Sequence, residues 1–198
     1  MEGAAKDGNR IHGLAQLLSA QDSSALPPVE CWDPPYRGDI GMAIKADGTW
    51  LYQGSPIARQ AMVRLFSRVL RRDADGRHYL VTPAERVDID VADAPFLAVE
   101  MQVEGRGEAQ QLIFRTNVDD IVHCGPDNPL HFEEEACTSG LKPYILVRRG
   151  LRALVTRAVY YDLVELAVPV AADSDALCLW SGGEKFALAA APDGRDRT

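Results

Sequence analysis

The feature that most constrains the fold is a set of short apolar segments separated by turn residues, arranged twice in the order β-β-α-β-β. In the first copy, two strand patterns flank Asp47-Gly48, a pair that is typical of a hairpin turn between alternating segments. A helical segment and a second pair of strands complete this copy. The expected elements are residues 40–44, 49–53, 56–71, 77–82 and 86–91. This order predicts a small α+β domain.

The helix of the first copy is predicted over residues 56–71. Ser55 is of a type favoured at the N-cap, and proline, here Pro56, is favoured at the first helical position. Apolar residues recur at helical spacing: Ile57, Ala61, Met62, Leu65, Phe66 and Val69. This spacing predicts an amphipathic helix with one buried face.

The second copy of the pattern lies in residues 143–190. Two strands precede a helix that Thr156 caps and that runs to Val164, and two further strands follow. The expected strands are residues 143–148, 151–155, 177–180 and 185–190. The closing hairpins of the two copies can be overlaid with few identities, Tyr79–Thr82 on Leu177–Trp180 and Val87–Ile89 on Phe186–Leu188. The overlay indicates a repeated pattern.

Strands between the two copies join the second one. They are expected at residues 96–103, 110–116, 121–124 and 130–132. Together they predict a curved antiparallel sheet closed by one helix, the element order of a pleckstrin-homology-like roll. The expected domains are residues 1–30 (an amphipathic helix over 9–21 and a Pro-rich linker), 31–95 (first α+β domain), 96–191 (second α+β domain) and 192–198 (a disordered tail).

Composition narrows the class of protein. The 198 residues carry a formal net charge of −8, which argues against nucleic acid as a partner because phosphate binding favours a basic surface. No apolar stretch approaches the roughly 20 residues of a membrane-spanning helix, and Met1–Arg10 lacks the pattern of a secretory signal. We therefore expect a cytoplasmic protein with neither a nucleic-acid nor a membrane partner.

The sequence predicts no metal site and no cofactor. Four residues of zinc-competent type lie close together in sequence, but their spacing matches no common zinc pattern: His123, Cys124, His131 and Cys137. The chain also lacks a nucleophile elbow, a phosphate loop and a dinucleotide fingerprint. We therefore expect a protein that is not an enzyme, with a metal-dependent nucleotide hydrolase built on Asp119 and Asp120 as the alternative.

Arginines of the predicted helix are the first candidate ligand-binding residues. Arg64 and Arg68 share one side of the helix with Arg71 and Arg72. Because a guanidinium group matches phosphate and carboxylate bidentately, this side is a candidate anion site. The alternative is a solvated helix face, with the last-turn arginines favoured by the helix dipole.

Five further residues complete the candidate set. Arg115 and Asn117 stand where a strand ends in polar residues, and Asn117 is either a ligand of a ribose or base edge or part of a turn cap. Arg148 falls on the same strand face as Tyr144 by alternation, which suits a base or a phosphate. Tyr144 and Trp50 are either stacking platforms or core residues.

Separated blocks of the chain carry a family resemblance. They are Trp50-x-Tyr52-x-Gly54-Ser55-Pro56-Ile57, Met62 to Leu70, Tyr79 to Glu85, Phe114-x-Thr116-Asn117-x-Asp119 and Pro143-Tyr144-Ile145-x-Val147. The chain resembles a bacterial domain-of-unknown-function family, numbered 1285, over roughly residues 31–190. The resemblance implies duplicated domains, a second half superficially similar to pleckstrin-homology folds, a role in signal transduction and a nucleotide-like ligand at the cleft between the domains.

Two hypotheses about function follow. In the first, the protein is a ligand-sensing module in which the arginines and Asn117 of both halves hold an anionic, nucleotide-like small molecule. In the second, it is a protein-interaction or structural module without a small ligand, and a protein partner or a second copy of the chain docks along a sheet edge or groove. A polar pocket favours the first hypothesis and a large exposed apolar patch favours the second.

Overall fold

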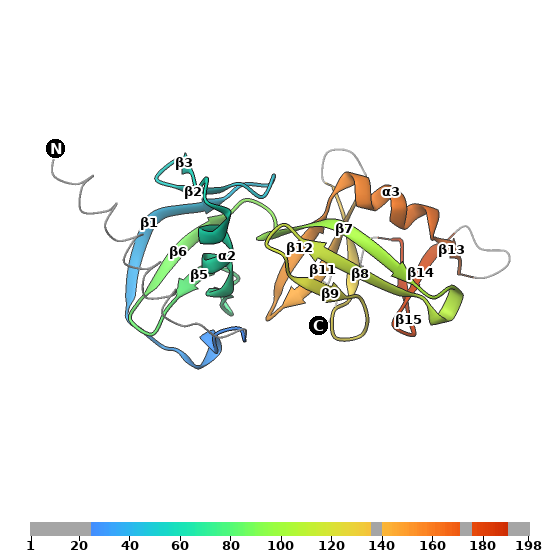
Figure 1. Ribbon diagram of the computed structural model, residues 1–198, viewed down its shortest axis with the longest axis horizontal. Coiled ribbons are helices and arrows are strands. Elements are labelled where there is room, and N and C mark those ends of the chain that lie inside the picture. Colours follow the sequence, from blue (N-terminus) through green and yellow to red (C-terminus); the bar gives the residue numbers. More distant parts are fainter. Residues whose placement is uncertain (1–24, 136–139, 171–175, 190–198) are drawn as a thin grey trace, which may run out of the picture. The chain divides into compact units, whose positions relative to one another are not determined.

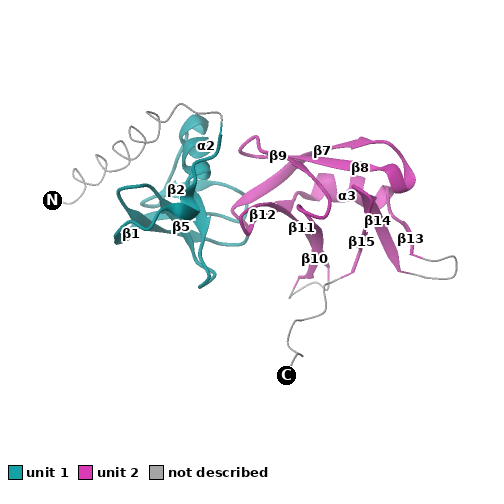
Figure 2. Cartoon of the chain, turned by 90° about the horizontal axis from the view of Figure 1, so that it is seen from below, with its two compact units in different colours: residues 1–93 teal, residues 94–198 magenta. Residues whose placement is uncertain are grey.

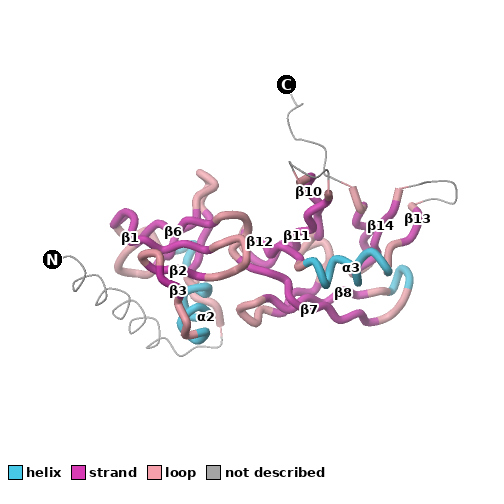
Figure 3. The backbone as a smooth tube through the Cα atoms, turned by 90° about the horizontal axis from the view of Figure 1, so that it is seen from above, coloured by secondary structure: helices cyan, strands magenta, loops and turns pink. Residues whose placement is uncertain are grey.

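The computed structural model describes residues 25–135, 140–170 and 176–189 (Figure 1). The chain divides between Asp93 and Ala94 into two compact units (Figure 2). Strands dominate both units, which confirms the two-unit α+β architecture (Figure 3). The helix expected over 9–21 and the tail at 192–198 lie outside the described residues. No helix in the described part is long and apolar enough to cross a membrane.

Unit 1 is built on a six-stranded sheet in the order β3-β2-β1-β6-β5-β4. Its strands are β1 (Tyr36–Ile44), β2 (Trp50–Tyr52), β3 (Ser55–Pro56), β4 (Leu70–Arg72), β5 (His78–Val81) and β6 (Arg86–Val91). The central pair, β1 and β6, is parallel, and every other pair is antiparallel. The expected hairpin at Asp47-Gly48 is confirmed, since Ile44 pairs with Trp50 across it.

Helix α2 (Gln60–Arg68) is shorter than predicted. Ser55 and Pro56 pair with Tyr52 and Leu51 as strand β3, so the proposed helix start is occupied by sheet pairing. At the other end, β4 pairs with β5 from Leu70 onward, which removes Arg71 and Arg72 from the helix. Tertiary pairing has overridden the local signals.

The core of unit 1 lies between α2 and one face of this sheet. The helix buries Val63, Phe66 and Ser67, whereas Ala61, expected inside, is exposed. The sheet contributes alternate residues of its central strands, as period-two packing requires. These buried residues are Met42, Ile44, Trp50, Leu80, Val87 and Ile89.

Unit 2 repeats the sheet topology of unit 1. Its strands are β7 (Phe96–Glu104), β8 (Gln111–Thr116), β9 (Ile121–His123), β10 (Leu130–Glu134), β11 (Leu141–Arg148) and β12 (Leu151–Val155), in the order β10-β11-β12-β7-β8-β9. In each unit the first and last strands of the six form a parallel central pair, and each heads an antiparallel meander. The prediction of a wholly antiparallel sheet is therefore wrong, because the sheet of unit 2 contains the parallel pair β7 and β12.

The repeat has a different alignment from the predicted one. Residues 177–188 do not take the place of β5 and β6, because β13 (Val168–Pro169), β14 (Leu177–Ser181) and β15 (Glu184–Ala187) form a separate three-stranded sheet. The counterparts of β5 and β6 are β11 and β12. Periodicity identified the strands, but pairing between strands about fifty residues apart leaves no local pattern.

The six-stranded sheet of unit 2 is curled. Its two edge strands, β9 and β10, are joined by residues 124–129 alone, so the seven Cα–Cα steps from His123 to Leu130 reach at most about 25 Å when fully extended. A turn, in which the Gly125 amide donates to the Asn128 carbonyl at 3.1 Å, shortens this reach. Five strand spacings of a flat sheet span about 24 Å. The edges must therefore curve toward each other.

Helix α3 (Arg157–Glu165) and the small sheet complete unit 2. Thr156 occupies the N-cap position as predicted, but its side chain makes no capping hydrogen bond; Val159 and Leu163 are buried. Val164, expected inside, is 40% exposed. Strand β14 contacts β8 and the 3-10 turn η2 (Gly107–Ala109), and β15 contacts β10, so the hairpin packs on both halves of the curled sheet.

Candidate functional site

A pocket of about 560 Å³ lies on unit 1, over the central strands of its sheet. Strands β1, β5 and β6 form its floor. Its charged and polar lining comes from Asp39, Arg77, His78, Asp88 and Asp90. Asp88 and Asp90 alternate with the buried Val87 and Ile89, so these carboxylates point away from the face that packs on α2. We call this site the sheet pocket.

Two irregularities of β1 shape one wall of the sheet pocket. The register between β1 and β6 shifts on either side of Asp39, and glycines at both places adopt positive φ, 83° at Gly38 and 77° at Gly41. The Asp39 carboxylate accepts a hydrogen bond from the Gly41 amide at 2.7 Å. A Cβ on Gly41 would approach Gln53 Cγ to 3.2 Å. The irregularities bend the strand and fix the Asp39 side chain beside the pocket.

Among the carboxylates of the site, Asp88 accepts hydrogen bonds from two other side chains. It accepts hydrogen bonds from the Tyr36 hydroxyl and from Arg77, the latter at 2.7 Å, and its side chain is only 14% exposed. The bond to the carboxylate raises the pKa of Tyr36, since an ionised phenol could not donate it. Asp88 is therefore held as a fixed acceptor.

Arg77 is positioned at the rim by the β4–β5 turn. The Asp75 carboxylate accepts from the Arg77 amide at 2.9 Å and from the Tyr79 hydroxyl at 2.8 Å. The bond from the Arg77 amide is the largest cause of the lowered pKa of Asp75, and the bond to Asp75 raises the pKa of Tyr79. The Arg77 guanidinium lies 5.5 Å from the centre of the Tyr79 ring and is 59% exposed, so it keeps donors available to a ligand.

A second arginine stiffens the same face of the sheet. Arg86 pairs with Asp73 at 3.1 Å and lies over the rings of Tyr79, at 4.9 Å, and Tyr36, at 5.6 Å. Its Nε atom is buried without a hydrogen-bond partner. The arrangement fixes Tyr36, which in turn orients Asp88.

The sheet pocket carries an excess of negative charge. Three carboxylates line it, against one guanidinium that is already paired with Asp88. Within the described residues, nothing donates a hydrogen bond to the Asp90 side chain. In the same part of the chain, no three His, Cys, Asp or Glu side chains gather closely enough to hold a metal ion. The pocket can therefore accept hydrogen bonds from several separated donors at once.

The arginines and aromatic residue predicted from the first half of the chain lie outside this pocket. Arg64 is exposed on α2, and Arg68 donates a hydrogen bond to the Ala25 carbonyl at 2.6 Å. Trp50 is 2% exposed within the core, and its indole nitrogen has no hydrogen-bond partner. Arg71, expected on the helix, binds the Val29 and Trp32 carbonyls from β4.

Three predicted residues of the second half do come together. Arg115, Asn117 and Arg148 surround the turn between β8 and β9, and with Asp119 and Asp120 they form what we call the β8–β9 turn cluster. Asp119 adopts a positive φ of 66°, and Asn117 Oδ1 accepts from the Leu97 amide at 3.0 Å. Thr116 caps the turn, because its hydroxyl accepts from two amides within it.

Carboxylates neutralise the arginines of this cluster. Arg115 pairs with Glu100 at 2.5 Å and with Asp119 at 2.9 Å, and the first bond both raises the pKa of Arg115 and lowers that of Glu100. Arg148 pairs with Asp120. Asp119 and Asp120, the aspartates considered for a hydrolase, are thus the ion-pair partners of Arg115 and Arg148, the arginines that were predicted to bind an anion.

Tyr144 is a core residue with a different cation beside it. It is 2% exposed, stacks on His131 with ring centres 5.6 Å apart, and lies under the Arg152 guanidinium at 4.0 Å. The alternation that placed it beside Arg148 is broken by a register shift between Leu146 and Arg148. Arg148 lies over the Phe96 ring instead, at 4.8 Å.

The zinc-competent residues have separate surroundings. His123 is exposed, Cys124 is buried, and His131 is part of the Tyr144 stack. Cys137 lies outside the described residues. Among the described residues, five of the nine exposed large apolar side chains fall between residues 161 and 177. They are Tyr161, Val164, Val168, Val170 and Leu177.

Two of the pocket carboxylates, Asp88 and Asp90, could have been recognised as site candidates from the sequence. Aspartate is depleted in strands, yet Asp88 and Asp90 alternate with Val87, Ile89 and Val91 in a predicted strand. Two carboxylates on one strand face are a departure from local propensity, which is expected at functional sites. Asp39, in contrast, reaches the pocket through the parallel pairing of β1 and β6, which has no local signature.

Fold and site together define a protein of two topologically related α+β units, one of which carries a polar pocket of small-molecule size. Family models match each half of the chain: the N-terminal domain of unknown function DUF1285 over residues 27–94, and the C-terminal domain of protein of unknown function DUF1285 over residues 95–188. The chain belongs to the DUF1285 family, as its sequence blocks predicted.

Solved structures of the family agree with this architecture. A DUF1285 family protein from Silicibacter pomeroyi DSS-3 is 45% identical and matches with a TM-score of 0.79, over 88% of this chain and 93% of that one. A second, from Shewanella baltica OS155, is 25% identical with a TM-score of 0.50, over 63% of this chain and 91% of that one. No curated protein matches the chain.

Proposed function

We propose that the protein is a cytoplasmic ligand-sensing module of signal transduction whose binding site is the sheet pocket of unit 1. The observation that carries the proposal is that Asp39, Asp88 and Asp90 line one pocket, with a volume of about 560 Å³, together with Arg77. Small-molecule pockets have volumes of about 300–1,000 Å³ and a few placed polar groups. The ligand in this proposal is a small polar molecule that donates hydrogen bonds to the carboxylates.

The fixed geometry of Asp88 supports ligand recognition. The Tyr36 hydroxyl donates to one of its carboxylate oxygens and the Arg77 guanidinium donates to the other, which fixes its orientation. A carboxylate has about four lone-pair sites, so each oxygen can still accept a hydrogen bond from a ligand donor. Asp39, which is held by one amide, and Asp90 supply the remaining acceptors.

The proposal is tested by a thermal-shift screen of polar metabolites, since a ligand that binds only the folded protein raises its apparent stability by mass action. Each hit is then measured against Asp39→Asn, Asp90→Asn and the control Asp162→Asn, an exposed aspartate on α3. We expect the shift to be lost in the first two variants and retained in the control. Hits whose stabilisation survives in both pocket variants would place the binding site elsewhere and refute the proposal.

A second candidate is the binding of an anionic, nucleotide-like ligand by the β8–β9 turn cluster. It is supported by the meeting of Arg115, Asn117 and Arg148 at one turn, and the pleckstrin-homology-like roll expected for unit 2 belongs to the same proposal. A phosphate would have to displace Asp119 or Asp120 from the arginines. The contribution of Arg64 and Arg68 to such a ligand stays a prediction from the sequence.

Titration with AMP decides this second candidate. Replacement of Arg115 by Gln should weaken AMP binding by at least about 10-fold, the loss expected when a bond to a charged group is removed. The control is Arg106→Gln, an exposed arginine before η2. Equal affinities of the two variants would exclude the turn cluster as the AMP site.

The protein-interaction alternative is supported by the exposed apolar side chains of residues 161–177. In this alternative a protein partner or a second copy of the chain covers them. Sedimentation equilibrium of the protein and of Val168→Asp tests the second copy. An association that Val168→Asp weakens would support it, and a monomer at high concentration would rule it out.

A further inference from the structure

We propose that the ligand of the sheet pocket is an organic cation with at least two amino groups, such as a diamine or polyamine. This inference rests on the proposed function and names the chemical class of the ligand. Three observations carry it: the charge left uncompensated in the pocket, the spacing of its carboxylates, and the size of the concave surface that they line.

The charge of the pocket sets the sign of the ligand. Three carboxylates face one guanidinium, and Arg77 already pairs with Asp88 at 2.7 Å, so Asp39 and Asp90 have no cationic side chain assigned to them among the described residues. Asp39 stands opposite Asp88 in the pairing of β1 with β6. Like charges on paired positions destabilise a sheet. A cationic ligand relieves this repulsion, whereas an anion adds to it.

The spacing of the carboxylates favours several separated cationic groups over a single metal ion. Asp88 and Asp90 are two residues apart on one strand face, about 7 Å along the strand. A Ca²⁺ or Mg²⁺ ion needs its oxygen ligands within about 2.0–2.6 Å. In the described part of the chain no such group of acidic or ligating side chains exists. Separated carboxylates are instead matched by ammonium groups at the ends of an alkyl chain, each of which offers three donors.

The floor and rim of the pocket fit such a chain. Gly41 and Ala43 of β1 lie between the charged side chains, and Ala43 stands opposite Asp90 in the sheet. Alkyl carbons pack on these small residues without leaving polar groups unpaired. The irregular β1 backbone holds Asp39 toward the pocket through the bond from the Gly41 amide. One ammonium group is assigned to Asp90 and another to Asp39.

Spermidine is the test ligand, with putrescine, adenosine and magnesium chloride as comparisons. Binding is followed by amide chemical shifts of residues 88–91 and by calorimetry at fixed ionic strength. The full-length chain is used with the Asp39→Asn and Asp90→Asn double variant and with Asp162→Asn, and circular dichroism confirms that each variant is folded. We expect spermidine to bind at residues 88–91, the double variant to lose at least 10-fold in affinity, and Asp162→Asn to match the native chain.

The comparison ligands separate failure of this inference from failure of the proposed function. Adenosine that shifts residues 88–91 where spermidine does not would overturn the amine class and leave the pocket as the binding site. Spermidine binding that is equal in the double variant and in Asp162→Asn would reduce the effect to general attraction by an acidic surface, and would also overturn the inference. If neither spermidine nor putrescine shifts residues 88–91, the amine class is refuted, and the metabolite screen with the single pocket variants decides the proposed function separately.

Discussion

The Ser181 hydroxyl donates a hydrogen bond of 2.7 Å to the main-chain carbonyl of Cys124, 57 residues earlier in the chain. The same oxygen accepts from the Leu112 amide at 2.9 Å. Gln111 adds bonds to Ser181 and to the Cys124 carbonyl, at 3.3 and 2.8 Å. This fully buried hydroxyl thus joins three segments: β14, the beginning of β8, and the connection that follows β9.

Replacement of Ser181 by Ala should lower the free energy of unfolding by about 2–3 kcal/mol. The substitution leaves the buried Leu112 amide without this acceptor, which costs about 1–3 kcal/mol, and it removes one of the two donors to the Cys124 carbonyl, which keeps the bond from Gln111. Urea denaturation measures the change. Ser55→Ala, at an exposed position of β3, is the matched control and should shift stability by less than about 0.5 kcal/mol. Equal effects of the two substitutions would contradict the role assigned to Ser181.

Gly182, the next residue, should not tolerate a side chain. Its φ is 58°, and a Cβ there would lie 3.1 Å from the Cys124 carbonyl oxygen and 3.2 Å from Gly125 Cα. Gly150 also has a positive φ, 73°, but a Cβ there would meet nothing within 4 Å. Gly150→Ala should therefore cost only the backbone term of about 1–2 kcal/mol. Gly182→Ala should cost measurably more in the same urea titration, and a smaller loss than at Gly150 would disprove the close contact.

Arg71 anchors the segment that precedes β1. Its Nη1 atom donates to the carbonyls of Val29 and Trp32, both at 2.8 Å, while the rest of the guanidinium pairs with Asp73. Lysine cannot make these bonds together, because it lacks the planar fork. Arg71→Lys should therefore speed amide hydrogen exchange in residues 29–32 and lower stability by about 2 kcal/mol. Arg72→Lys, on an exposed neighbour, is the control, and unchanged exchange in Arg71→Lys would refute the anchoring role.

The sequence predicted those elements whose signals are local. Strands β6 and β12 have the predicted bounds, and α3 starts after Thr156 as expected. The parallel central pair of each sheet was not predicted, since it joins strands separated by most of a unit. The predicted end of α2 was wrong for a related reason. After Arg68 the chain pairs as β4 with β5 instead of continuing the helix, and this pairing depends on tertiary contacts that a local pattern does not contain.

The candidate site was predicted less well than the fold. Charge and residue type singled out Arg115 and Arg148, but their pairing with Asp119 and Asp120 depends on a turn with positive φ and on a register shift in β11. The parallel pairing of β1 with β6 brings Asp39 next to Asp88 and Asp90, and this pairing has no local signal in the sequence. Asp88 and Asp90 could have been found as charged residues in a strand, whereas Asp39 could not.

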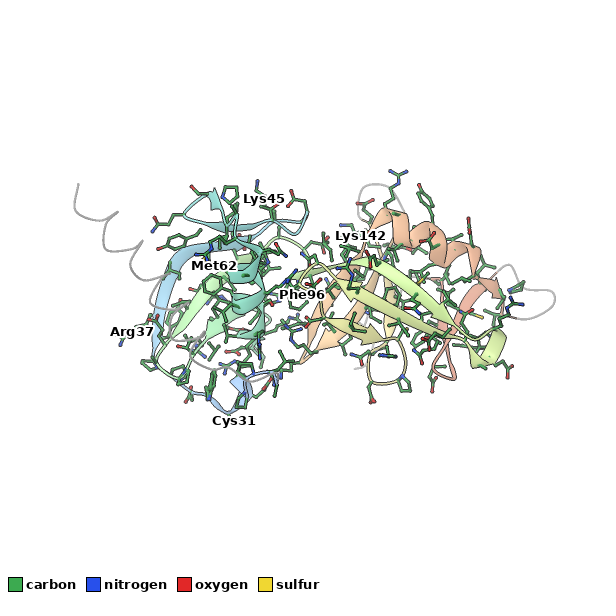
Figure 4. All side chains as sticks on the ribbon, viewed as in Figure 1. Cys31, Arg37, Lys45, Met62, Phe96 and Lys142 are labelled. Carbon is green, nitrogen blue, oxygen red and sulfur yellow. The ribbon has the colours of Figure 1, made fainter. Side chains whose placement is uncertain are left out.

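The exposed thiol of Cys31 should react faster with an alkylating reagent than the buried thiols of Cys124 and Cys178. Cys31 is the exposed last residue of the 3-10 turn η1 (Val29–Cys31) of unit 1 (Figure 4), whereas Cys124 and Cys178 are buried. Burial raises the pKa of Cys124 to about 11, so its thiolate form is scarce at neutral pH. In a timed iodoacetamide reaction at pH 8, mass spectrometry should find Cys31 alkylated first, and Cys124 and Cys178 only after unfolding. Early alkylation of Cys124 would show that the β9–β10 connection opens in the native protein.

Stability should fall on mild acidification through His131. Burial, and then the charge of Arg152, lower the pKa of His131, and Glu133 opposes them less strongly. The unfolded chain therefore takes up the proton at a higher pH, near 6.5, than the folded one. The contribution of the neutral ring is complete above pH 6.5 and is lost as the pH falls through the lower folded value. Protonation would also set a cation beside the Arg152 guanidinium that lies over Tyr144.

Unfolding by urea at pH 7.5 and at pH 5.5 measures this dependence, with His131→Gln as the comparison. The native chain should lose more stability between the two pH values than His131→Gln does, because glutamine cannot take up the proton. His123→Gln, at an exposed position, keeps the titrating ring at 131 and should follow the native chain. If His131→Gln retains the full pH dependence, the acid sensitivity arises elsewhere and the stack of His131 on Tyr144 does not govern it.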